Sequence, residues 1–398
     1  MNLRSSLVVC LFTWILCSCN ISVTSFPPSP LPQETATVAP TEVPPTPYPD
    51  TPAPPAIAAS VIESPAFIDI QFFNELDGWG ITETYMIRTN DGGITWYDVT
   101  PPDLDEVAST VETFILDKDH AWVQKPDFNN FPNNGILYHT ADGGLTWSIS
   151  STPFSGGDLS FIDEDDGWML ADLGVGAGSN AVAVFQTTDG GATWTERYSN
   201  DPNNPEAGDT LPLGGLKSDL VPINMQTAWV GGVIYGPGTV YLFRTDDGGR
   251  NWMPVSLPLP DGAENVELGI DRDQMQFVSA QDGFLVVRMS GDSTQTAVYV
   301  TSDGGDTWTL TPTLIPEAGD SDFLSVDEAI IYNGEQFYVT HDAARTWTTV
   351  SPDIVFGDSF LTMDFVSPNS GWIVSVAEEQ RSLYRTHDGG ATWLPVTP

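Results

Sequence analysis

Residues 89–96 read Thr-Asn-Asp-Gly-Gly-Ile-Thr-Trp, and variants of this stretch recur along the chain. Successive copies begin between 39 and 58 residues apart, a period typical of one repeated supersecondary unit. The pattern Thr-x-Asp-Gly-Gly-x-Thr-Trp begins at Thr89, Thr140, Thr187, Thr245, Thr301, Thr340 and Thr386. Seven such units predict seven blades around an axis.

Each copy has the residues of a hairpin turn. Asp accepts hydrogen bonds from nearby backbone N–H groups, and Gly-Gly adopts positive φ without a steric cost. The Thr-Trp end favours the start of a new strand. The repeated Asp residues therefore have a structural explanation, without chemistry: Asp91, Asp142, Asp189, Asp247, Asp303, Asp342 and Asp388. In the sixth copy both Gly are replaced by Ala, so Ala344 is expected at a strained positive φ.

A second motif precedes each turn by about 15 to 25 residues, as repeat proteins with several strands per unit require. It runs from an aromatic residue through a short polar stretch to a small residue and Trp, as in Phe365 to Gly371-Trp372. The two motifs together predict four short strands in each unit. The predicted fold is all-β, a seven-bladed β-propeller of four-stranded antiparallel blades over residues 64–398.

These motifs carry a family resemblance. The repeated turn resembles the Asp-box of sialidases, and its pairing with Phe-x-n-Gly-Trp is similar to the repeats of the Ycf48/HCF136 family. That resemblance implies a propeller, and a role in photosystem II assembly or stability. It also implies a protein partner. Photosystem-associated members of the family are expected to carry a basic, Arg-rich patch, and this chain departs from that pattern because its net charge is −41.

The first 63 residues predict export. Arg4 and the apolar run Leu7 to Leu16 form a signal peptide too short to span a bilayer, and Leu16-Cys17-Ser18-Cys19 resembles a lipobox. Residues 1–19 are therefore expected to be a lipoprotein signal with Cys19 as the lipidated residue, and an ordinary secretory signal is the alternative. Residues 20–63 are rich in Pro and Thr and predict an extended tether outside the cytoplasmic membrane, in the periplasm or at the cell surface.

The net charge restricts the partners. A charge of −41, with only 13 Lys and Arg, argues against nucleic acid and against a polybasic membrane contact. Membrane association is expected only through the lipid. The charge permits a basic protein partner or divalent cations.

The loops opposite the repeated turns are the predicted binding face, because long variable loops on a rigid scaffold commonly carry binding sites. That face is acidic, with a few aromatic residues expected to be exposed. Its candidate residues are Phe128, Phe131, Tyr198, Tyr235, Asp261, Glu264, Asp271, Asp320 and Asp322. Ordinary solvated loop residues are the alternative reading for each carboxylate.

Enzymatic sites are not indicated. Sialidase chemistry requires three Arg on one face, whereas many of the Arg here lie beside or within the repeated turns, as Arg88 and Arg250 do. Neither a resident metal site nor a cofactor motif is predicted. A secreted glycoside hydrolase using paired carboxylates remains the alternative function, and a concave funnel with two carboxylates about 5 to 10 Å apart would favour it.

Overall fold

The computed structural model describes residues 59–104, 106–107, 111–317, 319–378 and 380–397. The predicted signal peptide, Cys19 and nearly all of the predicted tether lie outside these residues. The part that is described contains strands and two short 3-10 helices, η1 (Ala263–Asn265) and η2 (Gly357–Ser359), and no α-helix. Within it, no helix is long and apolar enough to cross a membrane.

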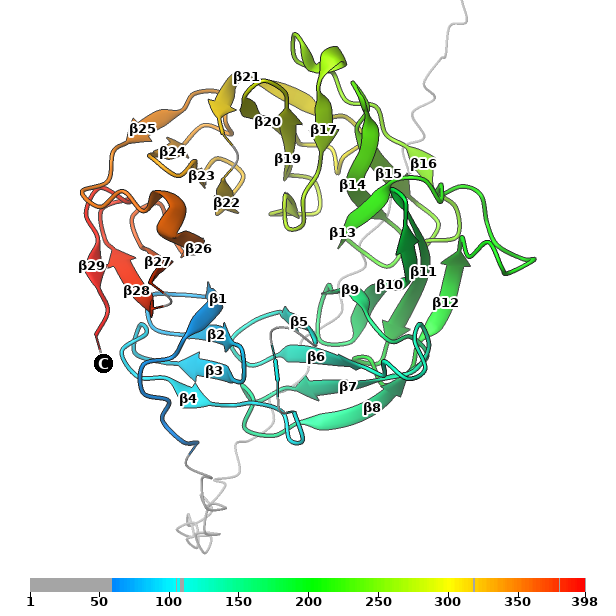
Figure 1. Ribbon diagram of the computed structural model, residues 1–398, viewed down its shortest axis with the longest axis horizontal. Helices are drawn as coiled ribbons and strands as arrows, with labels where there is room; N and C mark the ends of the chain where they lie inside the picture. Colours follow the sequence, from blue (N-terminus) through cyan, green and yellow to red (C-terminus); the bar gives the residue numbers. More distant parts are fainter. Residues whose placement is uncertain (1–58, 105, 108–110, 318, 379, 398) are drawn as a thin grey trace, which may run out of the picture. The chain divides into compact units, whose positions relative to one another are not determined.

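The strands form antiparallel sheets arranged around a common axis (Figure 1). Five sheets have four strands each, in chain order from the innermost strand to the outermost. Their strands are β1 (Phe67–Phe72), β2 (Gly78–Thr82), β3 (Met86–Thr89) and β4 (Tyr97–Asp98); β5 (Glu112–Ile115), β6 (Ala121–Pro126), β7 (Gly135–Thr140) and β8 (Ser148–Thr152); β9 (Gly157–Phe161), β10 (Asp166–Gly176), β11 (Ser179–Thr188) and β12 (Thr195–Ser199); β22 (Asp320–Phe323), β23 (Ala329–Tyr332), β24 (Phe337–Thr340) and β25 (Thr348–Val350); and β26 (Phe360–Phe365), β27 (Gly371–Ala377), β28 (Gln380–Thr386) and β29 (Leu394–Pro395).

The sixth sheet has nine strands. It combines two four-stranded groups with the bridging strand β17 (Glu267–Gly269), which pairs with both β14 and β19. The groups are β13 (Leu216–Pro222), β14 (Ala228–Pro237), β15 (Tyr241–Thr245) and β16 (Met253–Pro254), and β18 (Met275–Phe277), β19 (Gly283–Ser290), β20 (Thr294–Thr301) and β21 (Thr309–Pro316). Residues 256–273 connect the two groups. The chain there joins two sheets, because β14 and β19 extend beyond their inner neighbours and leave backbone groups free to pair.

The core lies between neighbouring sheets. Each innermost strand ends opposite the small residue of the second motif, as Phe365 does opposite Gly371. A Cβ on Gly371 would lie 2.4 Å from the Phe365 ring, so this close approach requires glycine. The Trp that follows is fully buried in the sheets that carry it, for example Trp168, Trp229 and Trp372.

The first and last sheets pack against each other and close the ring. The rings of Phe72 on β1 and Trp372 on β27 stack with centroids 3.7 Å apart. Trp372 Nε1 also donates to the carbonyl of Gly92 at 3.2 Å. Residues near both ends of the described chain, Ile62 and Val396, pack against this same cluster.

Hydrogen bonds distinguish the two faces of the ring. The repeated turn in each sheet lies beside the first hairpin turn of that sheet, as shown by Gly92 N–H donating to Leu76 O at 2.9 Å. We call this side the turn face. On the opposite side, hairpin loops pair with the links between sheets, as Gly357 N–H does with Gly334 O at 3.1 Å. We call this side the loop face. This arrangement confirms the predicted separation of turns and loops.

Candidate functional site

The seven repeated turns share one hydrogen-bond geometry. In each, the Thr hydroxyl donates to the Asp Oδ1 at 2.8–3.0 Å and accepts from the backbone N–H four residues later at 2.9–3.0 Å. The pKa of every one of these Asp residues is lowered, although burial alone would raise it in most copies, because the turn directs several donors at each carboxylate. These carboxylates fix the turn and offer no free acceptor pair for chemistry.

The predicted aromatic residues of the loop face fall into two groups. Phe128, Phe131 and Tyr235 are exposed, with 69%, 47% and 65% of their surface accessible. Tyr198 is buried, so its expected exposure was wrong. Its hydroxyl accepts the N–H of Leu211 at 2.8 Å, and this hydrogen bond holds the long link between β12 and β13 against β12.

The predicted acidic residues also separate. Asp261 and Glu264 are exposed around η1, as expected of solvated loop residues. Asp271 pairs with the guanidinium of Arg288 at 2.6 Å. Asp320 and Asp322 do not lie on a loop, which corrects their predicted position. Both belong to β22. The preceding strand β21 continues to Pro316, so the link between the two strands is short.

The position of Asp320 repeats around the axis. It lies three residues before the end of its innermost strand and pairs with Tyr332. Tyr332 lies two residues after Ile330, which occupies the position of the Trp in other sheets. The same position in four other innermost strands is acidic. Thr362 holds it in β26, and Gln274 holds it immediately before β18. We call the five acidic residues the central carboxylate ring: Asp69, Glu112, Asp158, Asp219 and Asp320. It lies on the strands that face the axis in Figure 1, near their loop-face ends.

Carboxylates of the innermost strands also join adjacent sheets. Asp322 accepts the N–H of Phe365 at 2.9 Å, and Asp320 accepts that of Met363 at 3.2 Å. Asp364 accepts the N–H of Phe72 across the closure between the last and first sheets. Each bond runs from one innermost strand to the next, so these side chains satisfy backbone donors that no strand partner covers.

One basic side chain enters the central carboxylate ring. Arg272, on the link that leads to β18, reaches the innermost strands β5 and β9 of two other sheets. Its guanidinium donates to Asp158 Oδ1 at 2.9 Å and to Glu112. The charge of Arg272 also acts on Asp69. A single cation thus contacts or influences three of the five ring carboxylates.

Asp219 is the least solvated member of the ring. It is 5% exposed, and its Oδ2 is fully buried without a hydrogen-bond partner. The charges of Asp158 and Asp273 act on its carboxyl, and Asp158 accepts the N–H of the next residue, Leu220. The ring therefore contains more acceptor capacity than its own donors satisfy.

Burial raises the pKa of the inner carboxyls. The pKa of Asp158 is raised to about 8, mainly by burial and then by the charge of Asp273, against the opposing bond from Leu220. That of Asp320 is raised to about 6, again chiefly by burial. Asp219 is raised well above its ordinary value by burial and by Asp158. Burial therefore disfavours the ionised form of these carboxyls, and a cation bound among them would favour it.

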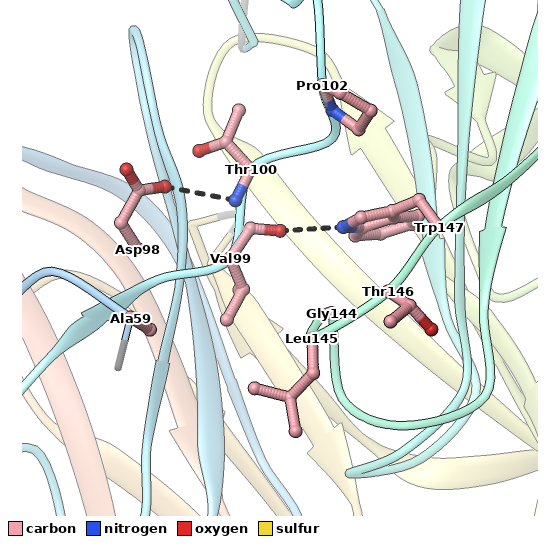
Figure 2. Close-up of a pocket in the computed structure, with 9 residues that line it drawn as sticks. All are labelled: Ala59, Asp98, Val99, Thr100, Pro102, Gly144, Leu145, Thr146 and Trp147. Carbon is pink, nitrogen blue, oxygen red and sulfur yellow. Dashed lines mark hydrogen bonds between the residues drawn. The ribbon is translucent and has the colours of Figure 1, made fainter. Parts of the chain in front are cut away.

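A metal site is not apparent in the described residues, where no group of three or more His, Cys, Asp or Glu side chains is arranged to hold an ion. The cavity drawn in Figure 2, of about 320 Å³, lies between the end of β4 and the turn at 144–147. Trp147 Nε1 in it donates to Val99 O at 3.0 Å. Asp98 is the only carboxylate among the residues drawn there, so this cavity lacks a carboxylate pair.

The ring was missed in the sequence, although a signal is present. Asp stands three residues before the strand-ending Phe in Asp69-Ile70-Gln71-Phe72, in Asp158-Leu159-Ser160-Phe161 and in Asp320-Ser321-Asp322-Phe323. Aligning the innermost strands on that Phe places the carboxylates at one level. The variable length of the loops led instead to a predicted binding face on the loops.

Comparisons with known proteins agree with the fold and leave two functional classes open. No family model matches the chain. The photosystem II assembly lipoprotein Ycf48 of Synechococcus sp. (strain CC9902) is 22% identical over 279 residues, covering 62% of this chain and 75% of that protein. A xyloglucanase of Paenibacillus sp is 23% identical over 336 residues, covering 77% of this chain but 27% of the enzyme.

A solved structure described as YCF48 bound to D1 peptide matches with a TM-score of 0.51 and 18% identity, over 84% of this chain and 96% of that chain. At that identity the likeness shows the fold alone. The chain spans only about a quarter of the length of the xyloglucanase. The protein is therefore a β-propeller similar to Ycf48 in sequence and fold, with a comparable sequence similarity to part of a xyloglucanase.

Proposed function

We propose that the chain is a non-enzymatic, exported and lipid-anchored scaffold that binds a protein partner through its loop face. The observation that carries this proposal is the position of Arg272, a protein side chain held between carboxylates at the axis. The centre of the loop face is thereby suited to recognise polypeptide side chains. We count the nine-stranded sheet as two blades, which makes seven with the five separate sheets.

The exposed aromatic residues support a protein partner. Phe128 and Phe131 lie on the loop between β6 and β7, and Tyr235 lies near the end of β14; all three are exposed. Aromatic residues are enriched in protein interfaces. The similarity to Ycf48 supports the same class, since one such structure holds a peptide. Lipidation at Cys19 would keep the propeller on the outer side of the cytoplasmic membrane, with the Pro- and Thr-rich segment as tether.

A glycoside hydrolase is the second candidate, favoured by the xyloglucanase similarity and by the raised pKa of Asp158. A general acid does require such a carboxyl. Against it, Arg272 occupies the position between Glu112 and Asp158, and the Trp side chains of both motifs serve in the turns and between sheets. A sugar platform of exposed Trp is therefore not available among the described repeats.

Photo-crosslinking tests the proposal. A crosslinking residue at Tyr235 on the loop face is compared with one at Leu145, an exposed residue of a repeated turn, in membranes of the source cell. We expect one defined protein adduct from position 235 and none from position 145. Release of reducing ends from xyloglucan, abolished by Asp158→Asn, would instead establish the hydrolase.

A further inference from the structure

We propose that the central carboxylate ring is a binding site for a guanidinium or primary ammonium group of the partner, and that Arg272 is an internal occupant displaced on binding. This inference rests on the proposed function and names the chemistry that the partner presents. Nothing in the repeats themselves requires a cation at the axis, because the sheets are joined by backbone donors and aromatic packing.

Arg272 is held in a way that permits exchange. It is 46% exposed, and its hydrogen-bond partners are Glu112 and Asp158, which come from two other sheets. Both of these carboxylates keep some contact with solvent, at 17% and 16% exposure. A guanidinium of a partner can therefore donate to the same oxygens of Glu112 and Asp158. Arg272 competes with that guanidinium for the site.

Asp219 supplies independent evidence of an unfilled acceptor. Asp219 is only 5% exposed, its buried Oδ2 has no donor, and Asp158 accepts the N–H of the neighbouring Leu220. A buried acceptor without a partner is costly, so a site with one gains from a ligand that donates hydrogen bonds. Arg272 leaves this oxygen unsatisfied, whereas a second donor group entering the ring would reach it.

The ring favours an organic cation over a metal ion. Its carboxylates sit on separate strands around the axis, and no three described acidic side chains converge on a common point. Hard divalent ions need six or more oxygens at short, fixed distances. A planar guanidinium instead spans two carboxylates, as Arg272 does here.

Titration calorimetry on the folded propeller with its tether tests the proposal. The probe is an N-acetylated, C-amidated tripeptide Gly-Arg-Gly, its neutral control contains citrulline in place of arginine, and spermidine represents free polyamines. We expect Arg272→Gln to bind the arginine peptide about tenfold more tightly than the parent does, because the internal competitor is gone. Adding Asp219→Asn should abolish that gain, whereas Asp261→Asn on the exposed loop should not.

Three results would overturn the proposal: equal binding of the citrulline peptide, no gain in Arg272→Gln, or a gain unaffected by Asp219→Asn. Preference for spermidine over the peptide would reject a side chain as the source of the cation. Should Arg272→Gln fail to fold, Arg272→Lys keeps a cation that cannot span both carboxylates, and it must give a smaller gain in the same direction. Crosslinking from Tyr235 without peptide binding would reject the ring while leaving the scaffold intact.

Discussion

Phe284 on β19 and Ala344 in the sixth repeated turn share one buried cluster, at the place where the two preceding turns pair Trp168 with Gly249 and Trp229 with Gly305. A Cβ on Gly305 would lie 2.4 Å from the ring of Trp229, so the larger indole excludes alanine there. The smaller ring of Phe284 leaves room for the methyl group of Ala344. The two replacements are therefore coupled, and a double-mutant cycle can measure the coupling.

The first prediction concerns that pair. Phe284→Trp alone should destabilise the fold by about 1–3 kcal/mol, because the indole meets the Ala344 methyl. In the background of Ala344→Gly the same change should cost much less. Urea unfolding of the parent, both single variants and the double variant gives the coupling energy. Additive effects would show that the two side chains do not compete for space.

The second prediction concerns backbone strain in the same turn. Ala343 and Ala344 have φ of 57° and 59°, so the expected positive φ is confirmed and extends to both residues. Ala343→Gly should stabilise the protein by roughly 1 kcal/mol, since alanine pays a steric cost there and its methyl is only half-buried. Ala344→Gly relieves a similar strain but loses a fully buried methyl, so its net effect should be smaller.

Thermal melts of the two variants beside the parent check this prediction. A gain from Ala343→Gly that exceeds that from Ala344→Gly supports the balance of strain against burial. A lower midpoint for Ala343→Gly would mean that this turn is not strained in solution.

The third prediction concerns pH. Burial, offset by the Phe72 N–H and reinforced by Asp69 and Asp320, raises the pKa of Asp364 to about 8. A carboxyl with a folded pKa above its unfolded value of roughly 3.9 binds more protons in the folded state, so stability falls as the pH rises from about 4 to about 8. Asp364→Asn keeps an acceptor for Phe72 and cannot ionise.

We expect urea midpoints of Asp364→Asn to exceed those of the parent at pH 8 and to match them near pH 5. Asp261→Asn, on an exposed loop, is the matched control and should change neither value. A parent whose stability is flat between these pH values would contradict the raised pKa.

The fourth prediction concerns the anchor. Cys19→Ser should move the protein from the membrane fraction to the soluble fraction, because it removes the residue proposed to carry the lipid. Fractionation of source cells followed by immunoblotting measures the change, with Cys17→Ser as the control that retains the anchor. Persistent membrane association of Cys19→Ser would reject lipidation at this residue.

Much of the fold was predictable because the repeated turn encodes its own geometry. The Thr and Asp of each copy form the same hydrogen bonds in every sheet. Gly-Gly is replaced only in the sixth copy, where the neighbouring aromatic side chain is Phe284 rather than Trp. The bridging strand β17 was not predictable, since Glu267–Gly269 is short and its pairing depends on how far β14 and β19 extend.

The candidate site was harder to predict for a different reason. Asp158 and Asp219 are distant in sequence, and only the rotation of each sheet about the axis brings their strands to one level. Arg272 lies on the link between β17 and β18, among the acidic residues Asp271 and Asp273. Its reach to Glu112 depends on a tertiary arrangement that residue patterns along one strand do not contain.

The stack of Phe72 on Trp372 has a consequence for cooperativity. In an open solenoid the terminal repeats have one neighbour each and fray first. Here the first and last sheets bury their aromatic residues against each other, and Ile62 and Val396 share their cluster. The first and last sheets therefore have a packed neighbour on both sides, as the other sheets do. Local unfolding at either end of the chain exposes the same interface. The propeller should therefore unfold as one unit, with no sheet peeling away ahead of the rest.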